Sequence, residues 1–218
     1  MVTYQLAIFD FDGTLADSFP WFQRVLNDVA RKFRFRPVEW SKAETELLRA
    51  KSAREIMQYL QVARWKVPLI SWHMRSLMCR DRDAIQLFPG IDRMLRGLSE
   101  RGVALAVVSS NSEENVRHVL GPDCATLVGD YACRASIFGK AAKIRAVLRR
   151  SRVPAAAAIY IGDEVRDGEA AGQAGVAFAA VAWGYTRVET LAALTPALML
   201  MSVDGVADAL VPPRSVLK

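Results

Sequence analysis

The chain has 218 residues, of which 52% are hydrophobic and 24% are charged, and this composition excludes a disordered protein. No apolar run is long enough to span a bilayer, and the first ten residues lack the pattern of a secretory signal. The three cysteines are scattered and do not form CxxC pairs, so we expect reduced thiols and a cytoplasmic protein with no membrane partner.

The net charge of +6 is unevenly distributed along the chain. Residues 16–86 hold 14 Lys/Arg against 8 Asp/Glu, and the remainder is neutral. A basic segment suits an anionic ligand, with nucleic acid as one candidate. The basic residues are interleaved with others at helical spacing, however, which favours a solvated helix face over a nucleic-acid partner.

The first element is a short apolar run at residues 4–9, which predicts a buried strand. Residues 16–86 contain no convincing strand and are interpreted as an all-helical unit. Serines that can cap helices precede three of its segments. The predicted helices cover residues 18–35, 41–50, 52–61 and 67–83.

From residue 87 onward the pattern changes to apolar strands that alternate with helices. Strands are predicted at 103–111, 125–130, 157–164, 176–184 and 196–202, with helices at 91–102, 140–150 and 166–175. This alternation predicts an α/β fold with a parallel sheet covered by helices on both faces. Residues 1–15 and 87–218 would form this core, with residues 16–86 inserted after the first strand. The segment 211–218 is predicted to be a loosely held terminus.

Polar residues follow three of the predicted strands, where an open parallel sheet binds its ligands. These residues are Asp10 and Asp12, then Ser109 and Ser110, then Asp163, with Lys140 opening a nearby helix. Buried carboxylates without a counter-charge are costly. Oxygen ligands favour Mg²⁺, which we expect to be held by Asp10, Asp163 and the main-chain carbonyl of Asp12.

This set of residues predicts phosphoryl transfer. Asp10 would attack phosphorus and form an aspartyl-phosphate, while Asp12 protonates the leaving oxygen and later deprotonates water. Lys140, Ser109 and main-chain N–H groups near Ser110 would bind the phosphoryl oxygens. The turn after Asp12 would depend on Gly13 for its backbone and on Thr14 for a hydrogen bond.

These segments resemble the motifs of the haloacid dehalogenase-like superfamily, in the order that the family has them. "DFDGTLADS" is similar to its first motif, "AVVSSN" to the second, "FGKAAK" to the third and "GDEVRDGEAAGQAG" to the fourth. The resemblance implies a Rossmann-like core with the small α-helical cap of the phosphoglycolate-phosphatase-like branch. It also implies that Asp167 supports the metal ligand Asp163. The residues after Lys140 differ from the pattern common in this branch of the family, so Lys143 competes weakly for the role of Lys140. Asp12 argues against a dehalogenase.

The predicted function is therefore a Mg²⁺-dependent phosphatase that acts on a small phosphorylated metabolite. A phosphomutase on the same scaffold and a non-catalytic binding module are the alternatives. In the helical unit, the tryptophans are interpreted as packing residues. Arg49 and Arg54 are interpreted as solvated helix residues in preference to contacts with an anionic substrate.

Overall fold

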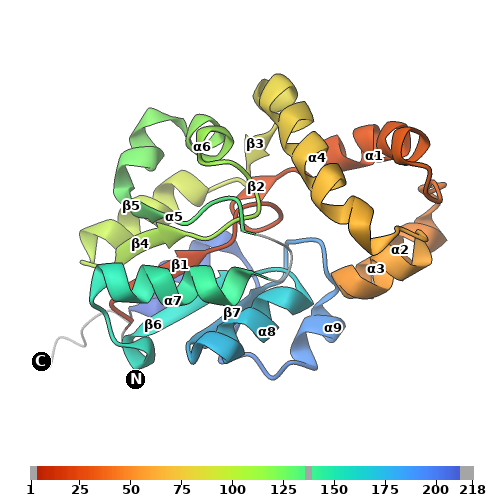
Figure 1. The fold of residues 1–218 in the computed structure, drawn as a ribbon. Helices are drawn as coiled ribbons and strands as arrows, with labels where there is room; N and C mark the ends of the chain where they lie inside the picture. The colour runs from red at the N-terminus through yellow and green to blue at the C-terminus, as the bar shows by residue number, and fades with distance from the viewer. Residues whose placement is uncertain (1–3, 136–138, 212–218) are drawn as a thin grey trace, which may run out of the picture.

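The structure is a computed structural model that describes residues 4–135 and 139–211. Its centre is a parallel sheet of six strands in the order β5-β4-β1-β6-β7-β8 (Figure 1). The strands are β1 (Leu6–Phe9), β4 (Ala104–Val107), β5 (Val128–Tyr131), β6 (Ala158–Gly162), β7 (Ala177–Val181) and β8 (Leu198–Leu200). The predicted α/β fold with a parallel sheet is confirmed.

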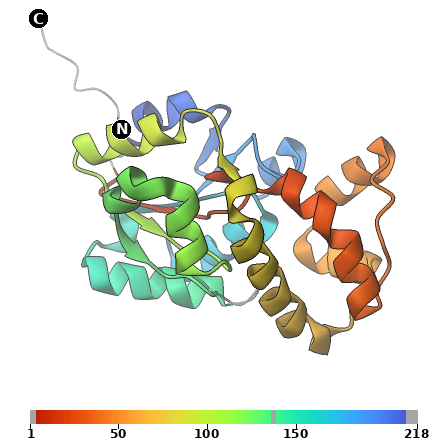
Figure 2. The same cartoon turned by 90° about the horizontal axis from the view of Figure 1, so that it is seen from above.

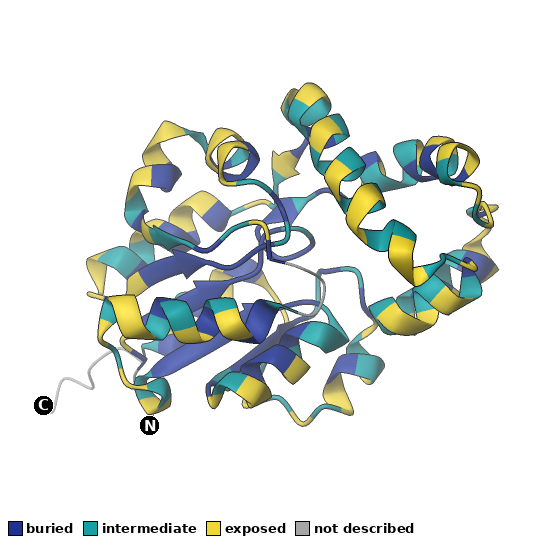
Figure 3. Cartoon of the chain, viewed as in Figure 1, coloured by how far each residue is buried: buried dark blue, intermediate teal, exposed yellow. Residues whose placement is uncertain are grey.

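Helices cover both faces of this sheet because successive strand residues point to opposite faces. In β1, Ala7 and Phe9 pack with α5, α6 and α10, whereas Leu6 and Ile8 pack with α7, α8 and α9. Figure 3 shows the resulting sheet as an almost continuous buried layer, and Figure 2 shows α5 and α7 on opposite sides of it. These helices are α5 (Ile91–Glu100), α6 (Glu113–Leu127), α7 (Lys140–Ser151), α8 (Val165–Ala174), α9 (Val188–Ala192) and α10 (Val206–Leu210).

Four further helices form the unit that we call the cap, residues 16–86, and they lie close to their predicted positions. They are α1 (Phe19–Phe33), α2 (Lys42–Arg49), α3 (Ala53–Tyr59) and α4 (Val67–Asp81). Ser41 and Ser52 cap α2 and α3 by accepting from main-chain N–H groups, as expected. Ser18 precedes α1 but makes no such bond, so its predicted capping role is wrong. Its hydroxyl instead donates a hydrogen bond to Asp12.

The expectation that residues 16–86 contain no strand is wrong at both ends of the segment. β2 (Ala16–Asp17) pairs antiparallel with β3 (Gln86–Leu87), which begins at the last residue of the cap. Strands of two residues carry no periodic pattern that a sequence could reveal. Their pairing places the two connections of the cap side by side, where they enter and leave the core.

A second difference concerns α6, which has no predicted counterpart. Gly121 takes a left-handed φ of 73° and is followed by Pro122, so the helical path is kinked there and its periodicity is broken. The strand expected at 125–130 begins only at Val128 because α6 extends to Leu127. The short helices α9 and α10 also lacked a sequence signal. Short 3-10 turns lie at Arg64–Lys66, Arg82–Ala84, Ala155–Ala157 and Val203–Gly205.

The topology determines where a site can form. From β1 the chain moves outward through β4 to β5, and it then returns to the other side of β1 to form β6, β7 and β8. Ligands in open parallel sheets bind at the carboxyl ends of the strands beside such a reversal. The predicted terminus 211–218 lies outside the described residues except for Val211. Within the described ranges, no helix is long and apolar enough to cross a membrane.

Candidate active site

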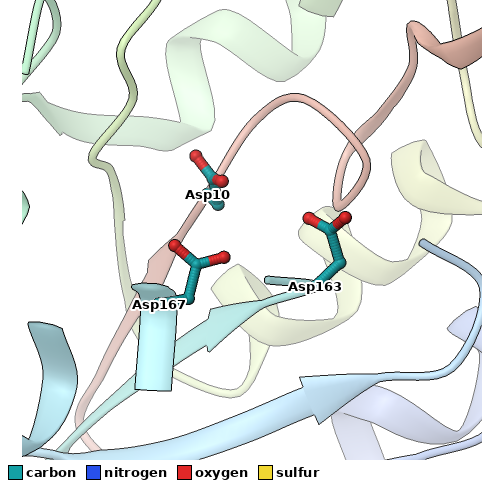
Figure 4. Close-up of side chains that lie close together, drawn as sticks. All are labelled: Asp10, Asp163 and Asp167. Atoms are coloured by element: carbon teal, nitrogen blue, oxygen red, sulfur yellow. The ribbon is translucent and has the colours of Figure 1, made fainter. Parts of the chain in front are cut away.

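Three carboxylates meet at the carboxyl ends of β1 and β6. Asp10 follows β1, Asp163 follows β6, and Asp167 lies in the first turn of α8. Their side chains face one another in Figure 4, and one carboxylate oxygen from each lies within 4.8 Å of the other two. All three are buried, with 2% of Asp10 and none of Asp163 and Asp167 exposed. The convergence predicted for Asp10 and Asp163 is therefore present in the structure.

Lys140 balances two of these charges. Its Nζ lies 2.8 Å from Oδ2 of Asp10 and 2.5 Å from Oδ1 of Asp167, and the lysine is itself buried. The aspartates raise its pKa although burial, the larger influence, opposes them. Lys143, one turn further along α7, is partly exposed, so Lys140 is the lysine that the fold brings to the carboxylates.

Asp163 is held by two loops that follow different strands. Thr14 Oγ1 donates to Oδ1 of Asp163 at 2.9 Å, and the main-chain N–H of Tyr185 donates to Oδ2 at 2.9 Å. Gly13, with a φ of 80°, and Gly184 lie so close that a Cβ on either would overlap the Asp163 carboxylate or its Cβ. Gly13 thus has the backbone conformation expected of it, whereas the Thr14 hydroxyl bonds to Asp163 and not within the turn as expected. Gly184 was not among the predicted residues.

The carboxylates of Asp10 and Asp163 are unusually basic. Burial raises the pKa of Asp10 to about 7, although Lys140 lowers it. Burial also raises the pKa of Asp163 well above its ordinary value, and the neighbouring carboxylates Glu164, Asp167 and Asp10 raise it further. Clustered acids of this kind are stabilised by a cation. Because the donors are all oxygen atoms, the site fits a hard divalent ion such as Mg²⁺.

The Asp12 side chain is not part of this three-carboxylate group and has its own partners. Its Oδ1 accepts from Ser18 Oγ at 2.7 Å, and its Oδ2 accepts from the Asn111 amide at 3.3 Å. The Ser18 hydroxyl is also 2.5 Å from the phenol oxygen of Tyr185. Burial raises the pKa of Asp12, while the bonds from Ser18 and Asn111 lower it. The carboxyl group is thus fixed in orientation and biased towards its protonated form.

The segment after β4 supplies hydroxyl groups and an amide. Ser109 is fully buried, and its Oγ accepts from the main-chain N–H of Asn111 at 3.0 Å. Ser110 is partly exposed and lines a cavity together with Asp12, and its carbonyl accepts from Arg75 of α4 at 3.4 Å. Both serines therefore follow the strand that neighbours β1, at the same end of the sheet as Asp10.

Arg166 is a charged residue that the sequence analysis did not select. It lies in the first turn of α8, where a positive charge is unfavourable to the helix dipole, and that anomaly was the available signal. Its Nε lies 2.6 Å from Oε2 of Glu164 and one terminal nitrogen donates to Oε1 at 2.8 Å. Glu164 is thus bound to an arginine, in keeping with its omission from the expected metal ligands. The carboxylates of Glu164, Asp10 and Asp167 raise the pKa of Arg166 although burial opposes them.

The cap contacts the core through Arg49 of α2. Its Nε donates to the carbonyl of Tyr185 at 3.0 Å and a terminal nitrogen donates to the carbonyl of Gly184 at 3.5 Å. The expectation that Arg49 is a solvated helix residue is therefore wrong, since it connects the cap to the loop that holds Asp163. Arg54 is exposed, and it lines a second hollow of about 690 Å³.

The chain is similar to known proteins over most of its length. A family model described as haloacid dehalogenase-like hydrolase matches residues 7–181. The chain is 31% identical over 206 residues to a phosphoglycolate phosphatase from Synechococcus elongatus, covering 94% of this chain and 96% of that protein. It is 29% identical over 202 residues to the tyrosine-protein kinase PtkA from Mycobacterium tuberculosis, covering 85% of this chain and 64% of that protein.

The fold has close structural counterparts. The crystal structure of a predicted phosphatase from Clostridium acetobutylicum aligns with a TM-score of 0.79 at 21% identity, covering 95% of this chain and 98% of that one. At this level of identity the match supports the fold. The Rossmann-like core expected from the resemblance is thereby confirmed.

Proposed function

The chain belongs to the haloacid dehalogenase-like hydrolases and is a phosphoric monoester hydrolase of that family, and on this premise we propose its chemistry. The reaction is the Mg²⁺-dependent hydrolysis of a small phosphorylated metabolite through an aspartyl-phosphate on Asp10. The observation that supports the proposal is the position of Asp10, which pairs with the buried Lys140 and lies within 4.8 Å of a carboxylate oxygen of Asp163. The similarity to a phosphoglycolate phosphatase over 94% of the chain supports the substrate class.

Asp10 is the nucleophile in this mechanism. Its carboxylate must be ionised to attack, and the ammonium group of Lys140 at 2.8 Å favours that form. Asp10, Asp163 and the main-chain carbonyl of Asp12 would hold the metal, and Asp167 would support Asp163. When bound, a divalent cation offsets the clustered negative charge and polarises a phosphoryl oxygen of the substrate.

Asp12 is the general acid and base. Its raised pKa favours the protonated form that must first donate a proton to the leaving oxygen. The Asp12 carboxylate then accepts a proton from the water that attacks the aspartyl-phosphate. This step regenerates the protonated Asp12 and releases phosphate from Asp10. Ser18 and Asn111 keep both oxygens of Asp12 oriented through this exchange.

The phosphoryl group would be bound by Lys140, Ser109 and the main chain near Ser110. Lys140 supplies a positive charge, Ser109 supplies a hydroxyl, and main-chain N–H groups near Ser110 supply further donors. The ion pairs that Lys140 makes with Asp10 and Asp167 hold its ammonium group beside the attacking carboxylate.

The proposal is tested by assaying p-nitrophenyl phosphate and a panel of phosphorylated metabolites with Mg²⁺, with EDTA and with Asp10→Asn. We expect activity that requires Mg²⁺ and is lost in Asp10→Asn. Full activity in that variant would exclude Asp10 as the nucleophile. A phosphomutase remains the alternative on this scaffold, and it would return the phosphoryl group to a sugar instead of releasing inorganic phosphate. Product analysis with a sugar phosphate separates the two reactions.

A further inference from the structure

A cavity of about 350 Å³ extends from the candidate active site into the cap. At the catalytic end it is bordered by Asp12, Ser110 and Arg166. At the other end it lies among α1, α2, α3 and α4, the four helices of the cap. A substrate whose phosphate sits at Asp10 can therefore direct the rest of its structure into this space.

The wall of the cap cavity is apolar, and every cap helix contributes to it. Residues that line it include Phe22, Trp40, Leu48, Met57, Ile70 and Met74. Along α4 the lining positions recur at 67, 70, 71, 74, 75 and 78, which is one face of a helix. The opposite face of α4 carries Leu69 and Trp72, which are 51% and 65% exposed. The apolar residues that line the cavity are thus directed inward by the helical period.

Most of the cations around this cavity already have partners. Arg49 donates to the carbonyls of Tyr185 and Gly184, and Arg166 is paired with Glu164. Arg75 donates to the carbonyl of Ser110. Lys51 is the fourth cation in the lining. An apolar wall with its arginines engaged is suited to a hydrocarbon group and offers little to a second anionic group.

From these observations we propose that the substrate is a phosphomonoester whose alcohol carries an apolar alkyl or aryl group, and that this group occupies the cap cavity. This inference rests on the proposed phosphatase function and specifies its substrate class. A cavity of about 150 Å³ lined by aliphatic and aromatic side chains accommodates benzene. The cap cavity is more than twice that size, which is enough for a ring with several additional carbons.

The test compares kcat/KM for ethyl, butyl, hexyl and phenyl phosphate with kcat/KM for 2-phosphoglycolate. We expect kcat/KM to rise about fourfold for each added methylene between ethyl and hexyl phosphate, the equivalent of about 0.8 kcal/mol for each buried group. Phosphoglycolate is the critical competitor because it is small and carries a second negative charge. If it exceeds hexyl phosphate, or if chain length has no effect, the inference is wrong.

Variants of α4 locate the effect. Ile70→Trp fills the cavity, and Leu69→Trp is the matched control on the exposed face of the same helix. We expect Ile70→Trp to lower kcat/KM for hexyl phosphate more than tenfold while ethyl phosphate stays within twofold, and Leu69→Trp to change neither. Met74→Phe is a smaller filling change in case the tryptophan prevents folding. Equal losses for both substrates would overturn the inference.

Binding separates this inference from the proposed function. Hexylphosphonate and ethylphosphonate cannot be hydrolysed at the P–C bond, so their affinities can be measured by calorimetry without turnover. Tighter binding of hexylphosphonate that is lost in Ile70→Trp supports the cavity even if no phosphatase activity is found. Equal affinities for the two phosphonates overturn the inference even if the enzyme is active.

Discussion

Lys140 Nζ and Asp10 Oδ2 form an ion pair of 2.8 Å in which each side chain is only 3% exposed. Lys140 also pairs with Asp167, so this single ammonium group balances two buried carboxylates. The pair links the start of α7 to the end of β1. In the proposed mechanism Lys140 would therefore have two functions, to hold the nucleophile Asp10 and to bind the phosphoryl group.

The first prediction concerns Lys140→Met, which removes this charge. We expect kcat/KM for a phosphomonoester to fall about 10²- to 10³-fold, as when one donor to a developing negative charge is lost. Two buried carboxylates lose their partner, so we also expect the free energy of unfolding to fall by about 3–5 kcal/mol. Lys143→Met, one turn along the same helix, is the control. It should keep kcat/KM within twofold of the wild-type value and leave the free energy of unfolding nearly unchanged. Comparable losses in the two variants would contradict the role given to Lys140.

The second prediction concerns Ser18, which donates to Asp12 at 2.7 Å. This bond lowers the pKa of Asp12, which burial raises. Removing it with Ser18→Ala therefore raises that pKa further. Because Asp12 must be protonated for the first step, we expect the alkaline limb of the kcat/KM profile to move to higher pH. Tyr185→Phe, which removes the other partner of the Ser18 hydroxyl, is expected to lower kcat and leave KM little changed.

Ser52→Ala is the control for these two variants. It removes the N-cap of α3 on the exposed side of the cap, at a cost of about 1 kcal/mol in stability. Its pH profile should match that of the wild type. An unchanged alkaline limb in Ser18→Ala would show that Ser18 does not act through Asp12.

Much of the candidate site could be predicted because its residues stand at the ends of apolar strands. Asp10, Asp163 and Ser109 each follow a buried strand, and parallel strands bring their carboxyl ends to one edge of the sheet. The core strands were recognisable as apolar runs, and the helices of the cap by their period, with serine caps at α2 and α3. This information is local, so the sequence alone contains it.

The missed features depend on contacts between distant segments. Tyr185 meets Ser18 across 167 positions, and Arg49 meets the Tyr185 carbonyl across 136. Neither contact has a local pattern, and Arg49 in particular occupies an ordinary helical position. Gly184 was missed for the same reason, because its requirement for a small residue comes from Asp163, which follows a different strand.

The third prediction follows from that crowding. A Cβ at Gly184 would overlap Asp163, so Gly184→Ala must displace the carboxylate. We expect the Mg²⁺ concentration for half-maximal activity to rise at least tenfold, as for changes to residues that support a metal ligand. Gly172→Ala in α8 is the control, because nothing lies within 4 Å of a Cβ there. It should leave the Mg²⁺ requirement unchanged and raise stability by about 1 kcal/mol. The same shift in both variants would count against a specific contact with Asp163.

The fourth prediction joins metal binding to pH. In the folded metal-free protein the pKa of Asp10 is about 7, whereas its ordinary value is 3.8. Asp10 therefore keeps its proton to a higher pH when the chain is folded. The folded state therefore binds more protons than the unfolded chain between these values, and its stability falls as the pH rises through this window. The raised pKa of Asp163 adds to this effect with the same sign. A cation competes with these protons, so Mg²⁺ should stabilise the protein more at pH 8 than at pH 5.

Thermal unfolding with EDTA or Mg²⁺ at the two pH values measures this difference. At pH 8, Mg²⁺ at about 100 times its Kd contributes about 2.7 kcal/mol. For a chain of this size, that corresponds to an increase in Tm of roughly 5–10 °C. Asp163→Asn removes one of the expected ligands and should abolish most of the increase, while Asp204→Asn, an exposed carboxylate in an ion pair with Arg93, should retain it. An equal or larger Mg²⁺ effect at pH 5 would mean that these carboxylates do not bind the ion.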